Sequence, residues 1–195
     1  MIQILYRDNQ KVHGKNLTMS KIRRICLFSG PGSGKSTTSA RLFSELKVRG
    51  YDVEYILEYI KTWAHEGRKP VSYDQFYVFA KQLKSEDTVL RSVQTIVTDC
   101  PVMLNVAFSC FYNTPGCQEM VGIAQQFDRD FPPLNFFIER TVGYVQKGRY
   151  ESQEQAIAFD VFLKDFLDEK LQSPLNKIKV DDIDKIINLV EENIN

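Results

Sequence analysis

The sequence predicts an α/β domain in which a five-stranded parallel sheet carries helices on both faces. Short apolar runs of strand length alternate along the chain with longer segments of helical periodicity, as in a parallel sheet with crossover helices. A glycine-rich turn joins the first apolar run to the first helical segment. No internal repeat or low-complexity linker divides the 195 residues, so we expect one domain over residues 21–195, preceded by an N-terminal arm at residues 1–20.

The composition argues against several classes of protein. Lys and Arg together number 25, as do Asp and Glu, so the net charge is zero. A surface that holds long nucleic acid by charge is therefore not favoured, although a local basic patch remains open. No apolar stretch is long enough to span a membrane and the N-terminus lacks a signal-peptide core, so we expect a cytoplasmic protein. The four cysteines show neither C-x-x-C spacing nor a histidine at ligand spacing, which predicts reduced thiols.

Residues 28–38 read Phe-Ser-Gly-Pro-Gly-Ser-Gly-Lys-Ser-Thr-Thr, between a predicted strand at 22–28 and a predicted helix at 34–49. The glycines let successive N–H groups point inward, and the free N–H groups of the following helix face the same side. Such a turn binds phosphate, and Lys35 can reach the β- and γ-phosphates while the Ser36 hydroxyl holds Mg²⁺. The motif predicts binding of ATP and Mg²⁺ through Gly30, Pro31, Gly32, Ser33, Gly34, Lys35, Ser36 and Thr37. Ser29 stands where the pattern G-x-x-x-x-G-K-[ST] has its first glycine, and Gly30 can carry the sharp turn instead.

Glu58 directly follows the second predicted strand, at residues 53–57. In an open α/β sheet the ligand crevice lies beyond the carboxyl ends of the strands, so the sequence places this carboxylate near the phosphate-binding turn. There it can accept a proton from a substrate hydroxyl that attacks the γ-phosphate, or it can be a solvated glutamate at a helix start. Trp63, the single tryptophan, is a candidate for stacking on a substrate or for ordinary core packing.

A helix is predicted at residues 73–91, with Ser72 as its N-cap. Its aromatic stripe is typical of a core face, but Gln75 and Gln82 lie seven residues apart on one face, as amides that read a base require.

Asp99 ends the third predicted strand, at residues 94–98. A carboxylate at this position beside a phosphate-binding turn is suited to hold Mg²⁺, directly or through water, and the alternative is a turn-capping Asp before Cys-Pro. Helices at 102–111 and 118–127 and a strand at 134–138 follow.

Residues 139–150 carry spaced cations and predict a lid over the phosphates. Arg140 and Arg149 can neutralise charge on the transferred group, although basic loops are also commonly solvated. The remaining chain predicts a helix at 152–171, a strand at 177–180 and a final helix capped by Asp181.

These parts in this order resemble small P-loop kinases of the P-loop NTPase fold, in particular the nicotinamide riboside kinase-like family with its compact phage-encoded members. The resemblance covers residues 23–171 and depends on residues 29–37, 58–59, 96–101 and 139–150. Glu58-x-x-x-x-Trp63 is also similar to the E-x-x-x-x-W element of deoxynucleoside kinases, in which the Glu is the base and the Trp lines the nucleoside pocket. The D-R-S signature of those kinases is absent, because Asp99 is followed by Cys100-Pro101.

The resemblance implies transfer of the γ-phosphate of ATP, with Mg²⁺, to a hydroxyl of a nucleoside-like acceptor. Glu58 is the expected base, with Asp99 as the alternative. Three other functions remain open: a kinase acting on a hydroxymethylated base in DNA, a nucleoside monophosphate kinase with Arg68 at its acceptor site, and a regulatory ATPase without a small-molecule acceptor.

Overall fold

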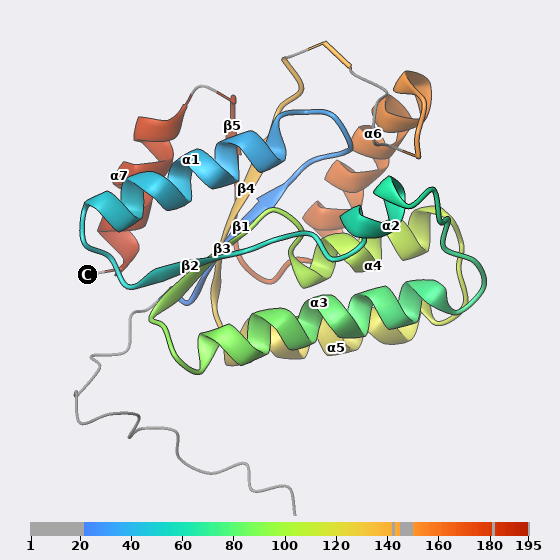
Figure 1. Cartoon of the computed structure of the whole chain (residues 1–195), viewed down its shortest axis with the longest axis horizontal. Coiled ribbons are helices and arrows are strands. Elements are labelled where there is room, and N and C mark those ends of the chain that lie inside the picture. Colours follow the sequence, from blue (N-terminus) through green and yellow to red (C-terminus); the bar gives the residue numbers. More distant parts are fainter. Residues whose placement is uncertain (1–21, 142, 145–149, 181, 195) are drawn as a thin grey trace, which may run out of the picture.

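A computed structural model describes residues 22–141, 143–144, 150–180 and 182–194. Within these residues, five parallel strands form one sheet in the order β2-β3-β1-β4-β5 (Figure 1). The strands are β1 (Arg24–Phe28), β2 (Val53–Ile56), β3 (Thr95–Thr98), β4 (Pro133–Ile138) and β5 (Leu175–Ile178). The predicted five-stranded parallel sheet is therefore confirmed.

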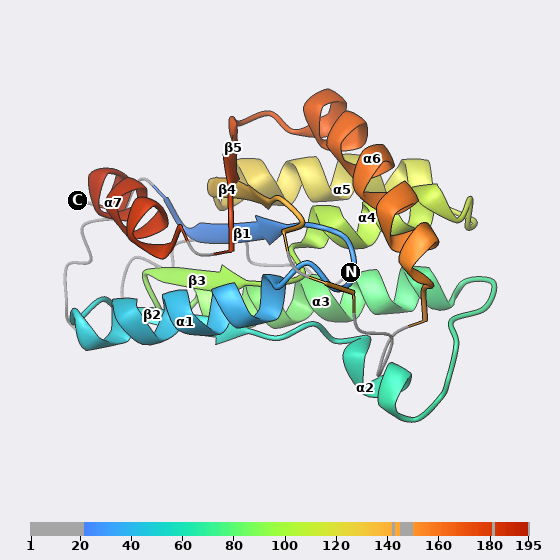
Figure 2. The ribbon, with the colours of Figure 1, turned by 90° about the horizontal axis from the view of Figure 1, so that it is seen from above.

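Helices cover both faces of the sheet (Figures 1 and 2). One face carries α1 (Lys35–Val48) and α7 (Ile183–Ile194), and the other carries α3 (Asp74–Leu90), α4 (Val102–Phe111), α5 (Cys117–Asp130) and α6 (Gln153–Lys170). A short helix, α2 (Lys61–His65), lies beyond the carboxyl end of the sheet (Figure 2). No described helix has the length and apolar character that a membrane crossing requires.

Two apolar cores follow from the alternation of side chains along β1. Ile25 and Leu27 point into the core under α1 and α7, while Cys26 and Phe28 point into the core under α3 to α6. Because both faces are buried, the central strand reads as a continuous apolar run rather than an alternating one.

Several elements differ from the predictions, most of them by one to three residues at an end. Tyr73, not Ser72, is the N-cap of α3, because Ser72 adopts a left-handed conformation with φ of 50° in the preceding turn. The last strand begins earlier than predicted, since its residues pair with β4 in the register Asn135↔Leu175. The short helix α2 was not predicted. The proposed cap Asp181 and the N-terminal arm lie outside the described residues.

Candidate active site

The phosphate-binding turn lies between β1 and α1, as predicted. Gly32 and Gly34 have φ of 80° and 90°, which are left-handed values that glycine adopts without strain. The Ser33 hydroxyl donates to the Gly30 carbonyl at 2.9 Å and also contacts the Ser29 hydroxyl, so polar side chains hold the turn from inside. Ser29 is fully buried there, which accounts for a serine at the first position of the motif.

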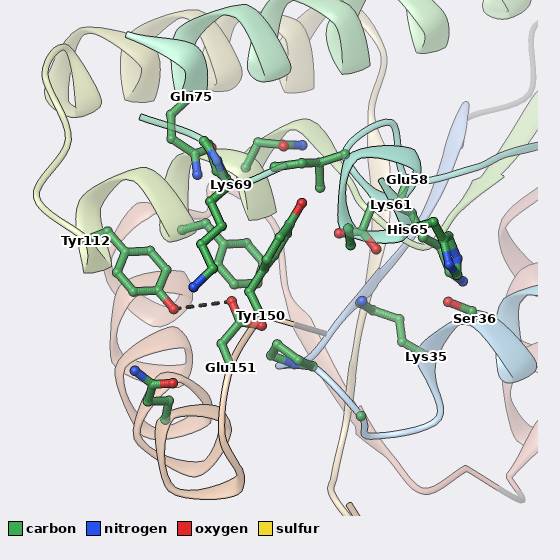
Figure 3. Close-up of a pocket in the computed structure, with 18 of the residues that line it drawn as sticks. Lys35, Ser36, Glu58, Lys61, His65, Lys69, Gln75, Tyr112, Tyr150 and Glu151 are labelled. Carbon is green, nitrogen blue, oxygen red and sulfur yellow. Dashed lines mark hydrogen bonds between the residues drawn. The ribbon is translucent and has the colours of Figure 1, made fainter. Parts of the chain in front are cut away.

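A cavity of about 630 Å³ begins at this turn and extends away from it (Figure 3). Lys35, Ser36 and Glu58 line the end at the turn, and Figure 3 shows the Lys35 amine and the Ser36 hydroxyl facing the region of Glu58. The other lining residues are Pro31, Gly32, Gly34, Thr37, Ile60, Lys61, Ala64, His65, Lys69, Pro70, Val71, Ser72, Gln75, Asn105, Phe108, Tyr112, Thr114, Tyr150, Glu151 and Gln155.

Glu58 enters the cavity from the turn after β2. Burial raises the pKa of its carboxyl group, and the nearby Asp99 raises it further, while Lys35 acts in the opposite direction. The carboxyl group of Glu58 thus feels both the cation of the phosphate-binding turn and a second acid. This is the environment of a carboxylate whose proton affinity is increased.

Asp99 is fully buried at the end of β3, the strand between β1 and β2. Neither of its carboxylate oxygens has a hydrogen-bond partner within bonding distance. The Tyr55 hydroxyl is nearby: burial is the main cause that raises the pKa of Tyr55, and the charge of Asp99 raises it further. Buried oxygens without donors are an environment suited to a cation. Asp99 is not itself among the residues that line the cavity, so it fits a magnesium ion held partly through water.

Ser36 supplies the other protein oxygen that fits Mg²⁺, since it lines the cavity at the start of α1. Among the described residues there is no cluster of three or more His, Cys, Asp or Glu that could hold a metal by themselves. This agrees with an ion that takes its remaining oxygens from phosphate and water.

The far end of the cavity is formed by residues that the sequence did not single out. Tyr112 donates a hydrogen bond from its hydroxyl to Glu151 Oε1 at 3.2 Å (dashed in Figure 3), and Glu151 is buried. Phe108 and Asn105 lie on α4, one and two turns before Tyr112, and also line the cavity. The only sequence signal for Glu151 is its place beside the Ser152 capping box of α6, which indicates a helix start and no chemistry.

Of the proposed acceptor residues, Glu58 and Gln75 line the cavity, while Trp63, Arg68 and Gln82 do not. Gln82 is buried, and its Oε1 accepts a hydrogen bond from the Tyr59 backbone N–H at 3.0 Å.

Trp63 is buried, stacks on Tyr77, and carries the Arg68 guanidinium 3.3 Å above its ring. Arg68 also lies 3.6 Å from Asp74. These contacts direct Arg68 toward the aromatic cluster and not into the cavity.

Arg140 follows β4 and lies against the phosphate-binding turn. Its Nη2 donates to the Pro31 carbonyl at 2.8 Å, and its Nε pairs with Asp160 Oδ2 at 2.7 Å. The Nη1 atom is buried without a hydrogen-bond partner. Arg149, the second predicted lid cation, lies outside the described residues.

Two solved structures resemble the fold. A deoxyadenosine kinase from M. mycoides, with the products dCMP and dCDP bound, matches with 19% identity and a TM-score of 0.56, over 87% of this chain and 99% of that one. An APS kinase from Mycobacterium tuberculosis matches with 10% identity and a TM-score of 0.48, over 88% of this chain and 99% of that one. No curated protein matches the sequence.

The first match shows that this chain shares the α/β fold of that kinase. It does not show the nicotinamide riboside kinase-like family that the sequence resembles. A family model for the AAA domain matches residues 24–184, which are most of the chain, so this protein belongs to the AAA domain family.

Proposed function

We propose that this protein is an ATP- and Mg²⁺-dependent kinase that transfers the γ-phosphate to a hydroxyl of a nucleoside-like small molecule. One observation carries the proposal: Lys35 of the phosphate-binding turn and the carboxylate Glu58 line the same cavity, which continues beyond them into a chamber with room for a second substrate. Phosphoryl transfer depends chiefly on positioning and charge stabilisation, and this arrangement supplies both.

Lys35 and the inward backbone N–H groups of the turn hold the β- and γ-phosphates. Ser36 and Asp99 hold Mg²⁺, which neutralises phosphate charge when it is bound. Glu58 accepts the proton of the attacking hydroxyl, and its raised pKa suits this task because a stronger base takes the proton more readily. Arg140 contacts the turn at the Pro31 carbonyl but does not line the cavity, so its role at the transferred phosphate, like that of Arg149, stays a prediction.

A nucleoside-like acceptor suits the far end of the cavity. The ring of Phe108 offers a surface for a base, and the amides of Gln75 and Asn105 can donate to and accept from its edge. The volume of about 630 Å³ lies within the range that holds ligands larger than a single phosphate group. The similar deoxyadenosine kinase has the product dCMP bound, which supports an acceptor of this class.

The charges at the far end are mixed, because Figure 3 shows the amine of Lys69 near Tyr112 and Glu151. Among the described residues, no arginine lines the cavity, because Arg68 stacks on Trp63. The buried Glu151 carboxylate lines the cavity and disfavours an anionic group, while the Lys69 ammonium group favours one, so an acceptor screen decides between a nucleoside and a nucleoside monophosphate. Hydroxyl groups, in contrast, can donate hydrogen bonds to this carboxylate.

The test is a screen of acceptors with γ-labelled ATP and Mg²⁺, covering nucleosides, nucleoside monophosphates and duplex DNA that contains hydroxymethylated bases. We expect label on a nucleoside. Lys35→Ala is expected to abolish transfer, because it removes the cation that holds the β- and γ-phosphates. Glu58→Gln is expected to lower kcat by about 10²- to 10⁴-fold with ATP binding unchanged, as for loss of a general base.

Other outcomes identify the alternatives. Label on DNA with a steep dependence on salt indicates a DNA-directed kinase. Slow ATP hydrolysis with no labelled acceptor indicates a regulatory ATPase. Full turnover by Glu58→Gln excludes Glu58 as the base and leaves Asp99 as the candidate.

A further inference from the structure

Two side chains hold the phosphate-binding turn from the side of α6. Asp160 Oδ1 accepts a hydrogen bond from the Gly30 backbone N–H at 2.7 Å, and Asp160 Oδ2 accepts from Arg140 Nε at 2.7 Å. Arg140 Nη2 in turn donates to the Pro31 carbonyl at 2.8 Å. Asp160 and Arg140, called here the Asp160–Arg140 clamp, therefore bind one N–H and one carbonyl of adjacent residues in the turn.

The packing at Gly30 shows that the clamp needs a glycine at this position. A Cβ atom on Gly30 would lie 2.4 Å from Asp160 Oδ1 and 3.1 Å from the Ala156 carbonyl oxygen. A Cβ at 2.4 Å would force the Asp160 carboxylate to swing away and give up its hydrogen bond to the turn, and the tight contact with the Ala156 oxygen would require a small shift of the helix backbone. The sequence therefore keeps a glycine at position 30 while Ser29 takes the first position of the motif.

The clamp also occupies the backbone N–H of Gly30. A peptide N–H makes one good hydrogen bond, and at Gly30 it is directed to Asp160 rather than to a phosphate. The predicted phosphate-binding role of Gly30 thus becomes indirect, and the inward N–H groups further along the turn remain for the nucleotide. Holding the turn in one conformation before binding removes an entropy cost from binding.

The opposite charges of Arg140 and Asp160 compensate each other. Both are largely buried, with exposed fractions of 16% for Arg140 and 15% for Asp160. A lone carboxylate this close to the turn would repel the triphosphate, and pairing with Arg140 removes that repulsion. The pair therefore gives the turn a firm anchor without adding net negative charge beside the phosphates.

We propose that Asp160 is a positioning residue for nucleotide binding, which acts through Gly30 and Arg140 to hold the turn in its phosphate-binding conformation. The inference depends on the proposed function only in that the turn binds a nucleotide. Gln155, on the same helix, lines the cavity. Asp160 itself lines no part of the cavity.

The experiment measures binding of a non-hydrolysable ATP analogue with Mg²⁺ by titration calorimetry, on the full chain. We expect Asp160→Asn to weaken binding by about 10- to 100-fold, the effect of losing a charged hydrogen-bond partner. The matched control is Asp165→Asn, which changes an exposed carboxylate on the same helix and should bind like the wild type. In the transfer assay, Asp160→Asn should raise KM for ATP with little change in KM for the acceptor, a split that a general loss of folded protein does not produce.

A double-mutant cycle with Arg140→Ala tests whether the two residues act as one unit. If they do, Asp160→Ala together with Arg140→Ala weakens binding no more than the worse single change. Additive losses contradict the clamp. If Asp160 variants unfold below the assay temperature, Arg140→Lys replaces them, because one ammonium group cannot contact Asp160 and the Pro31 carbonyl in the same way. Arg140→Lys should then bind at least about tenfold more weakly, and wild-type affinity overturns the proposal.

The outcomes separate this inference from the proposed function. If the wild type does not bind the analogue, the nucleotide-binding function itself is wrong. If the wild type binds and Asp160→Asn binds equally well, the function stands and only the positioning role of Asp160 is lost.

Discussion

Glu58 shows how a single residue acquires its chemistry from its neighbours. On a solvated helix start it would be an ordinary carboxylate. In the cavity, burial and the charge of Asp99 raise its pKa, and Lys35 limits the increase. The carboxylate of Glu58 can therefore accept a proton even though the cation Lys35 acts on it.

We predict a pH-rate profile with an acid limb that reports Glu58. The base must be ionised to act, so kcat falls as the pH decreases through the pKa of Glu58. Because that pKa is raised, the limb lies above the ordinary value of 4.5. The measurement is kcat against pH with saturating ATP, Mg²⁺ and acceptor. Residual turnover by Glu58→Gln should lack the limb, and a limb at or below the ordinary value would contradict the raised pKa.

At the scale of elements, α3 holds the turn that presents Glu58. Gln82 lies in the middle of α3, and its Oε1 accepts from the backbone N–H of Tyr59, the residue after Glu58. Gln82, predicted as a candidate for reading a base, instead joins a helix to the turn after β2.

We predict that Gln82→Met lowers both stability and transfer. Methionine keeps the length of the side chain but offers no strong acceptor, so the Tyr59 N–H loses its partner and the free energy of unfolding falls by about 1–3 kcal/mol. The Glu58 turn loosens, and kcat falls while ATP affinity is retained. Chemical denaturation and steady-state kinetics measure the two effects. Ser85→Ala, an exposed change on the same helix, is the control. Unchanged kcat in Gln82→Met would show that the turn is held by other contacts.

At the scale of the whole molecule, a buried ion network connects the central strand to two helices. Arg24 of β1 is fully buried and pairs with Glu86 of α3 at 2.9 Å and with Asp128 of α5 at 2.5 Å. Burial raises the pKa of both Glu86 and Asp128, and Arg24 opposes that increase. The network therefore holds two carboxylates ionised inside the protein only because the guanidinium lies between them.

We predict that Arg24→Met lowers the free energy of unfolding by about 3–5 kcal/mol near neutral pH, because it leaves two uncompensated carboxylates. Without Arg24 the folded-state pKa of each carboxyl rises further. The folded protein then binds more protons than the unfolded chain between the unfolded pKa of about 4 and the raised folded pKa, so stability falls as the pH increases through that window.

Urea denaturation at pH 5 and pH 8 checks this prediction. The loss should be smaller at pH 5, and Arg91→Met, at an exposed position, should lose little at either pH. A loss that does not depend on pH would show that missing packing, and not charge, causes the destabilisation.

Local sequence patterns were sufficient to predict much of the fold of this protein. The phosphate-binding turn depends on glycine and lysine spacing within a dozen residues, and the strands depend on apolar runs of a few residues. Because the carboxyl ends of parallel strands meet at one edge, the positions of Glu58 and Asp99 after their strands already predicted that they lie near the turn.

Other features required residues far apart in the chain to meet. Asp160 reaches Gly30 across 130 positions, and nothing in the local pattern of α6 distinguishes it from the exposed Asp165. Trp63 and Arg68 pack on each other and do not line the cavity, while Tyr112 and Glu151 line it from the end of α4 and from the segment before α6. Periodicity indicates which side of a helix is buried, but only the packing of α4 and α6 against the sheet decides which polar side chains on and beside these helices share one cavity.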